Sequence, residues 1–487
     1  MAANERTNLL PGPPEDDPRK TTLAWASPTD SRNPQNWPAS RKWGVAILIS
    51  FYALSGPMSS AMVVPAMPQM SQELGLTSET STQLLVSAYV LCWSLGTLFW
   101  GPLSEAYGRS TLLNVGQALF LVTNSLCALE WNGTRFLVLR SVSGLVGSAP
   151  LAIGGGVMTD LWKSEERGRS LAVYTAVPLL GPALGAIIGG FVVQNVSWRW
   201  IFWGCSAFTA CSLAVGLVFL TETFSPVILR REKARLLGNE FDDSGKTLLA
   251  ALKKLITVDL PRPLILLGTQ PIIQVLALYM AYLFGLNYLT LSTYQALWQD
   301  EYGQSVSMGS LNYISIGLGL VLGCEIAAPL NDKIYIFCKS RNKNIGVPEF
   351  RTYMMLPASL LVPLGLLWYG WSASAHLHYL MPNIGIFIYC FGLIIGFQCI
   401  QAYVLDCYPV YAASAIGALT VLRAITGCIF PIFGPVLYRG LGYGWASTLL
   451  AGIAGVIGVV APVGLKVWGP ALRARSPYAS GEAKVLL

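Results

Sequence analysis

One turn of the sequence sets an acid and a base four residues apart between two apolar runs. Residues 101–109 read GPLSEAYGR, in which Glu105 precedes Arg109. A carboxylate and a guanidinium at this spacing can pair with each other and with the end of a neighbouring helix. The glycines permit close helix approach and positive φ angles. The pattern indicates a tight charged connection between two helices, although an ordinary charged turn has the same spacing.

Three ionisable residues lie inside long apolar runs, namely Arg140, Glu325 and Arg423. Such side chains are costly in a membrane helix, so each is a functional hypothesis by default. For Arg140 the alternatives are a role in proton coupling and a fixed structural pair. For Glu325 they are a proton carrier and a buried partner for an arginine or the backbone.

Further charged residues lie near the ends of apolar runs. We expect Asp160 to pair with Arg169, and Glu105 with Arg109, as a latch that holds one conformation. The same predicted set of proton-coupling or latch residues is completed by Asp332 and Asp406.

The composition explains why buried charge matters here. The 487 residues are 53% hydrophobic and only 12% charged, whereas a soluble chain carries about 25% charged residues. Most side chains must therefore face lipid or one another. The ten cysteines and two histidines show no metal or disulfide spacing, so we expect no cofactor and no metal. The net charge of +7 is spread in short tracts between apolar runs, which argues against a nucleic-acid partner.

A membrane helix needs about 20 mostly apolar residues. The chain offers twelve such runs, which predicts an all-α membrane protein with two six-helix bundles. The predicted spans are 43–65, 82–102, 111–129, 135–160, 168–193, 200–220, 264–290, 308–329, 351–371, 378–405, 411–436 and 444–465. The predicted division is a disordered cytoplasmic tail at 1–42, a bundle at 43–220, a cytoplasmic loop at 221–263, a bundle at 264–465 and a cytoplasmic tail at 466–487.

Orientation follows from the basic residues, which concentrate on the cytoplasmic side of membrane proteins. With the N-terminus inside, the predicted outer loops keep Arg135, Arg199 and Arg439, and the inner segments hold nearly all other lysines and arginines. The two N-x-S/T acceptors, Asn132 and Asn195, also fall in predicted outer loops and are possible glycosylation sites. Both termini are therefore expected to be cytoplasmic.

The two halves repeat a short signature. Residues 101–105 (GPLSE) close the second predicted span, and residues 328–332 (APLND) close the eighth, about half the chain later. Internal repeats of this kind are typical of secondary transporters, whose substrate site lies near the membrane midplane between the repeats.

The segment 101–109 resembles the loop 2–3 signature of the major facilitator superfamily, and its SEAYGR form resembles the fungal drug:proton antiporter branch with twelve spans. The likeness extends over nearly all of the chain after residue 33. It is also carried by NPQNWP at 33–38, LRSVSG at 139–144, GPALG at 181–185, WRWIF at 198–202, TETFSP at 221–226, DCYP at 406–409 and Ser414-Ala415 leading to Arg423. The sequence departs from the branch at Thr221 and at Leu419, where relatives place Pro and Asn.

The resemblance implies a secondary active transporter that exports drugs, toxins or secondary metabolites in exchange for protons by alternating access. A small organic substrate, protons and the lipid bilayer are the implied partners. The implied setting is the plasma membrane of a fungal cell, where the chain would act as a monomer. A proton-coupled uptake permease and a transporter-like membrane sensor are the alternatives. No nucleophile–base or metal constellation suggests an enzyme.

The fifth predicted span carries a motif of small residues at Gly181, Pro182, Gly185, Gly189 and Gly190. Small residues let membrane helices approach closely, and a proline can bend a helix. The motif suits a moving helix pair at the seam between the halves, and packing alone is the other interpretation.

Polar and aromatic side chains on otherwise apolar spans are the candidates for the substrate cavity, because adaptable sites combine aromatic faces with a few polar groups. Interface anchoring and packing are the alternatives. The candidates are Tyr89, Trp93, Gln117, Tyr174, Asn287, Tyr288, Tyr294, Gln398, Gln401 and Tyr403.

The charge balance at mid-membrane depth bears on the cargo. The first half has no carboxylate at this depth, although proton exchange needs a titratable group. Arg140 and Arg423 make the predicted path more positive than negative, which favours neutral or anionic cargo over cations.

Overall fold

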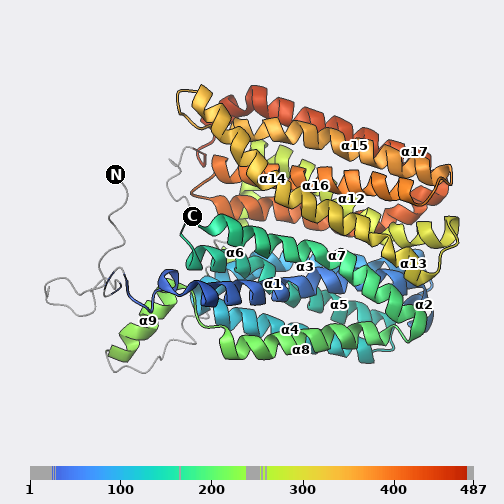
Figure 1. Cartoon of the computed structure of the whole chain (residues 1–487), viewed down its shortest axis with the longest axis horizontal. Helices are drawn as coiled ribbons and strands as arrows, with labels where there is room; N and C mark the ends of the chain where they lie inside the picture. Colours follow the sequence, from blue (N-terminus) through green and yellow to red (C-terminus); the bar gives the residue numbers. More distant parts are fainter. Residues whose placement is uncertain are drawn as a thin grey trace.

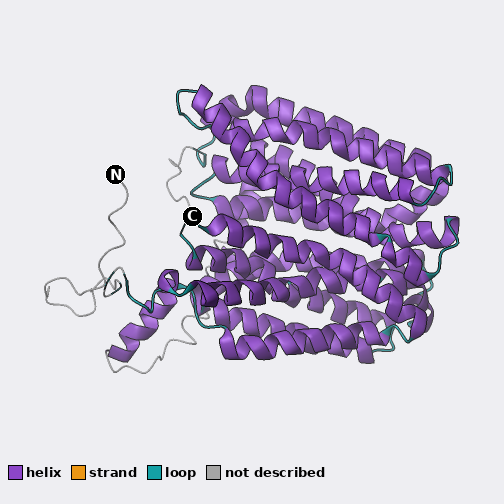
Figure 2. Ribbon diagram, in the orientation of Figure 1, coloured by secondary structure: helices purple, strands orange, loops and turns teal. Residues whose placement is uncertain are grey.

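The computed structural model describes residues 29–163, 166–236 and 260–479, together with a few isolated residues near residues 25 and 255. Helices and short connections make up this described part, which contains no strand (Figure 2). Some predicted segments lie largely outside it, including most of the N-terminal tail, much of the central loop and the last eight residues of the C-terminal tail.

Six membrane crossings form the first half of the chain. The first runs through α1 and its continuation α2, and the fourth runs through α5 and α6. The helices are α1 (Ala39–Met62), α2 (Met67–Glu73), α3 (Glu79–Tyr107), α4 (Arg109–Leu129), α5 (Gly133–Gly147), α6 (Ala149–Leu161), α7 (Arg167–Asn195) and α8 (Arg199–Phe219).

The second half begins after the short helix α9 (Ser225–Leu236). A helical break at Gln270 separates α11 (Pro261–Thr269) from α12 (Pro271–Ala296). The seventh crossing therefore begins at Pro271, later than predicted, because proline is favoured in the first turn of a new helix. The remaining helices are α13 (Val306–Leu311), α14 (Tyr313–Arg341), α15 (Thr352–Ser374), α16 (Leu380–Cys407) and α17 (Ala412–Ala474).

Helix α17 contains two crossings. Its 63 residues would span ~95 Å as one helix, about three times the thickness of a hydrocarbon core. The backbone leaves the helical region at Gly442, with φ of 72° and ψ of 165°. Glycine accepts this positive φ without steric cost. Eleven helical stretches of the described chain are long and apolar enough to cross a membrane, and with α17 counted twice the twelve predicted crossings are confirmed.

The helices of each half gather beside one another, the blue-to-green half below the yellow-to-red half in Figure 1. Helices α3 and α7 meet α17 and α14 of the other half along the seam. We call the face where α1 begins and α17 ends the terminal face, and the opposite one the distal face.

The glycine motif brings α7 against α1. A methyl group at Gly181 would lie 2.8 Å from Pro57 Cβ. One at Gly185 would meet the Met58 carbonyl oxygen, and one at Gly189 would meet that of Met62. Helices this close have no room for larger residues, so these three glycines set the separation of α1 and α7.

We expect Gly185→Val to destabilise the protein by about 1–3 kcal/mol, because the added methyl groups overpack the contact with α1. Thermal melting of the purified protein in detergent would measure the change. Gly155→Val is the matched control, since a Cβ there meets no atom within 4 Å. Equal melting temperatures for the two variants would contradict this account of the motif.

Candidate functional site

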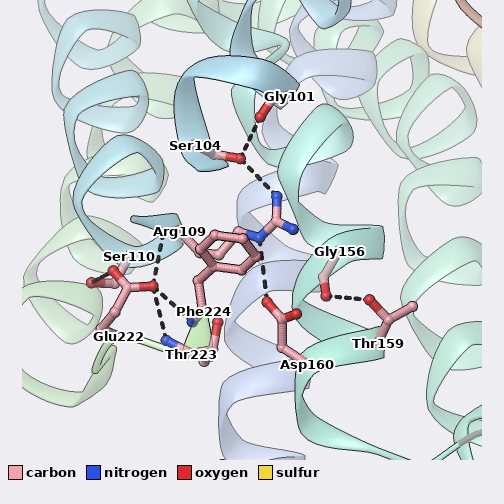
Figure 3. Close-up of polar contacts among 10 residues, drawn as sticks. All are labelled: Gly101, Ser104, Arg109, Ser110, Gly156, Thr159, Asp160, Glu222, Thr223 and Phe224. Carbon is pink, nitrogen blue, oxygen red and sulfur yellow. Dashed lines mark hydrogen bonds and ion pairs between the residues drawn. The ribbon is translucent and has the colours of Figure 1, made fainter. Parts of the chain in front are cut away.

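The turn between α3 and α4 places Arg109 at the start of α4, facing α6. Gly108 has a φ of 101°, so the chain reverses there and Arg109 turns inward. Its Nε lies 3.3 Å from Asp160 Oδ2, and its Nη1 donates to Ser104 Oγ at 2.7 Å (Figure 3). Gly156 leaves room for the guanidinium, since a methyl group there would lie 2.7 Å from Arg109 Cζ.

Glu222 completes this cluster and was not predicted as a site residue. Its Oε1 accepts the backbone N–H groups of Arg109 at 2.9 Å, Thr223 at 3.0 Å and Phe224 at 2.9 Å. A carboxylate at a helix N-terminus satisfies unpaired N–H groups and the helix dipole. The Phe224 ring lies 4.8 Å from Arg109 Cζ. The sequence signal was the segment TETFSP, whose acid follows the sixth span directly.

The two ion pairs predicted for the latch, Asp160 with Arg169 and Glu105 with Arg109, are wrong. Arg109 pairs with Asp160, and Glu105 is exposed with no ion pair among the described residues. Arg169 is also exposed, 5.6 Å from the Trp43 ring centroid. The reason is geometric. Residues 105 and 109 belong to different helices separated by Gly108, so their spacing along the chain does not place them on one face.

The second half contains an equivalent cluster around Arg351, which precedes α15 as Arg109 opens α4. Arg351 Nη1 lies 2.8 Å from Asp332 Oδ1, and its Nε lies 2.9 Å from Asp406 Oδ2. Asp406 lies near the end of α16, as Asp160 lies near the end of α6 in the first half. The arginine was missed because it lies in a connection without the complete signature. Its position before the ninth span was the available signal.

A second ion pair at the terminal face was also missed. Arg473 Nη2 lies 3.4 Å from Glu349 Oε2, and the Glu349 side chain is only 9% exposed. This pair ties the end of α17 to the segment that precedes α15.

Arg140 is fully buried and held by α1. Its Nη1 donates to Ser59 Oγ at 2.9 Å and its Nη2 to the Ser59 carbonyl at 2.7 Å. The guanidinium lies over the Tyr89 ring at 4.1 Å, and the Tyr89 hydroxyl donates to the Gly56 carbonyl at 3.0 Å. Asn124 extends the network by donating to Ser206 Oγ at 2.9 Å. No carboxylate among the described residues pairs with Arg140.

Arg423 approaches the same region from the second half. Its Cζ lies 4.9 Å from the Phe284 ring centroid, and the Phe284 and Tyr288 rings are 4.9 Å apart. The seam lies directly beside these rings, because a methyl group at Gly427 would meet both Phe284 and, in the first half, Val90 of α3. We call these residues on the two sides of the seam the arginine–aromatic row: Arg140 and Tyr89 in the first half, and Tyr288, Phe284 and Arg423 in the second.

The remaining cavity candidates have mixed surroundings. Tyr174 donates to the Pro150 carbonyl at 3.0 Å and Tyr294 to Asn383 Oδ1 at 2.9 Å, so both join helices of their own half. Gln398 Nε2 donates to Cys324 Sγ at 3.1 Å. Burial separates the others. Trp93, Gln117 and Tyr403 are buried, Asn287 and Gln401 are half-buried, and Glu325 is exposed.

The distal face carries polar links between the halves. The Ser307 N–H donates to Gln194 Oε1 at 2.8 Å, and Glu79 forms an ion pair with Arg439. Gly190 lies at the same junction, where a methyl group would collide with Ser310 of the second half. Ser307 Oγ also donates to the Gly190 carbonyl at 3.5 Å, and Thr175 and Cys324 approach each other across the seam at 3.9 Å.

The two sequons also lie near the distal face. Asn132 Oδ1 accepts the N–H groups of Thr134 and Arg135 and caps α5, while Asn195 Nδ2 donates to the Phe191 carbonyl at 2.7 Å. In the described part of the chain, no group of three His, Cys, Asp or Glu side chains is placed to hold a metal ion.

Comparison with known proteins identifies relatives over almost the whole chain. The family model described as the Major Facilitator Superfamily matches residues 49–431. An MFS-type transporter, oryF of Aspergillus oryzae, is 50% identical over 97% of this chain and 98% of its own. The efflux pump vrtL of Penicillium aethiopicum is 40% identical over 94% of this chain and 92% of its own.

A solved structure of the proton:xylose symporter XylE has the same fold. It superposes with a TM-score of 0.63 at 14% identity, covering 88% of this chain and 96% of that chain. The predicted fold is therefore confirmed.

We expect Arg109→Gln and Asp160→Asn to be energetically coupled by about 1–3 kcal/mol, because each removes one partner of a mostly buried ion pair. A double-mutant cycle of melting temperatures would measure this coupling. Glu105→Gln is the control, with an expected effect within about 0.5 kcal/mol. A coupling energy between Arg109 and Glu105, with none between Arg109 and Asp160, would contradict the ion pair described here and favour the pairing predicted from the sequence.

Proposed function

The chain belongs to the Major Facilitator Superfamily, and from that premise we propose that it is a proton-coupled efflux pump for small organic molecules. Two relatives at 40% and 35% identity carry the name efflux pump. The observation that carries the proposal is the arginine–aromatic row, because its members come from both halves at the seam. A site shared in this way changes its access when the halves rock.

The polar links at the distal face support alternating access. The Glu79–Arg439 and Gln194–Ser307 contacts tie the halves together on that side, so cargo would enter from the terminal face in this state. Export then requires these links to break. Surface ion pairs are weak and typically contribute less than about 1 kcal/mol. A modest gain in interaction free energy elsewhere in the protein is therefore enough to break them.

We assign the terminal face to the cytoplasm and the protein to the plasma membrane as a monomer. Arg41, Lys42, Lys333 and Arg341 lie toward the terminal face, whereas Arg135, Arg199 and Arg439 lie toward the distal face. The excess of basic residues on one side supports this orientation.

The proposed coupling residues fall into two groups. The clusters of Arg109 with Asp160 and of Arg351 with Asp332 and Asp406 act as latches within each half. Glu325 acts as a proton carrier, since its exposed side chain is within a span and bears the carboxylate that proton exchange needs.

An acid-inside pH gradient should drive accumulation of exported compounds in proteoliposomes, because outward proton flow would be exchanged for inward cargo flow. The measurement uses a panel of neutral and ionised aromatic compounds, with protein-free liposomes as the control. We expect the protonophore-treated sample to lose the accumulation. Passive equilibration that ignores the gradient would contradict proton coupling.

Charge reversal at the distal face provides a second test. Glu79→Lys alone and Arg439→Glu alone should each lower the transport rate several-fold, because like charges then oppose closure of this face. The double variant should recover much of the rate, since the pair is restored with its charges exchanged. Lys466→Glu, a charge reversal at an exposed cation of the second half outside this junction, is the control. A double variant no better than either single one would exclude the pair as a gate.

A further inference from the structure

We propose that the cargo is an organic anion with an aromatic or conjugated skeleton, and that the Arg423 guanidinium binds its charge. This inference rests on the proposed transport function and specifies the substrate class of the same site. It begins with the two arginines of the arginine–aromatic row, which differ in the hydrogen bonds that they make.

The guanidinium of Arg140 already forms hydrogen bonds within the protein. Two of its guanidinium nitrogens donate to Ser59, its charge lies over the Tyr89 ring, and its side chain is fully buried. These contacts hold it against α1. We therefore assign Arg140 a positioning role, in which it fixes Tyr89 at the seam.

The guanidinium of Arg423, by contrast, has N–H donors that no acceptor in the described chain satisfies. Within the described chain, no hydrogen bond or ion pair involves its guanidinium, and its Nε is buried without a partner. The residue as a whole is nevertheless only half-buried, which leaves part of it open to a ligand. A guanidinium keeps its charge in proteins, and leaving that charge unpaired in an apolar setting is costly. An anionic ligand supplies the missing acceptors.

The neighbours of Arg423 indicate the rest of the cargo. The Phe284 ring lies against the guanidinium, and this ring has Tyr288 at 4.9 Å and Phe397 at 6.2 Å between ring centroids. Aromatic rings favour flat, apolar partners. No carboxylate forms an ion pair with either arginine of the row among the described residues, so their two positive charges are not neutralised there and disfavour a cation. A carboxylate or an ionised phenol on an aromatic frame fits this combination.

Binding to the purified protein tests the proposal without relying on transport. Salicylate and larger aromatic carboxylates should raise the melting temperature of the wild type, whereas methyl salicylate and the tetraphenylphosphonium cation should not. Arg423→Gln should weaken acid binding at least about tenfold, because it removes charged hydrogen bonds. Arg423→Lys should retain part of the affinity.

Lys466→Gln is the matched control. Lys466 is another cation of the second half that lies over an aromatic ring, 4.5 Å from the Tyr353 centroid, and its loss should leave binding unchanged. The ligand-free melting temperature of each variant shows whether it has folded. Equal binding of acid and ester, stronger binding of the cation, no binding by any acid, or unchanged binding in folded Arg423→Gln would each overturn the proposal. Acid binding that persists without gradient-driven transport would reject the pump and leave the binding site standing.

Discussion

A guanidinium retains its charge at any pH that a folded protein survives, and the bilayer interior offers no water to solvate it. Every arginine that this chain carries near the membrane therefore requires a local solution. Arg109 and Arg351 use carboxylates at the terminal face. Arg140 uses a serine, a carbonyl and a tyrosine ring. Arg423 has only a ring within the described chain, and this difference singles it out.

Helix α7 packs more tightly against its own half than against the other half. Helix α7 lies against α1 through Gly181, Gly185 and Gly189, with no space for a larger residue. The same helix reaches the second half at Gly190 through a contact with Ser310. One helix thus packs tightly within its own half and also meets α14 of the other half along the seam. Tight packing within a half allows the halves to move as bodies against each other at this seam.

The charged clusters follow the same division. At the terminal face, Arg109 and Arg351 each bind acids of their own half, so these clusters persist when the halves separate on that side. At the distal face, Glu79 and Arg439 join the two halves, so this contact cannot survive separation there. The arginine–aromatic row lies between these levels, where rocking would change its access from one side to the other.

The sequence by itself determined the number of crossings, because the length of each apolar run is a local property that can be compared directly with the thickness of the bilayer. It also located the charged turn at 101–109 and the buried arginines, since these depend only on which residues interrupt apolar runs. The tertiary structure decided the partners. Arg109 binds Asp160 rather than Glu105, and Glu222 joins from more than a hundred residues away. Such choices depend on how each helix is rotated and on what the fold brings beside it, which no spacing along the chain encodes.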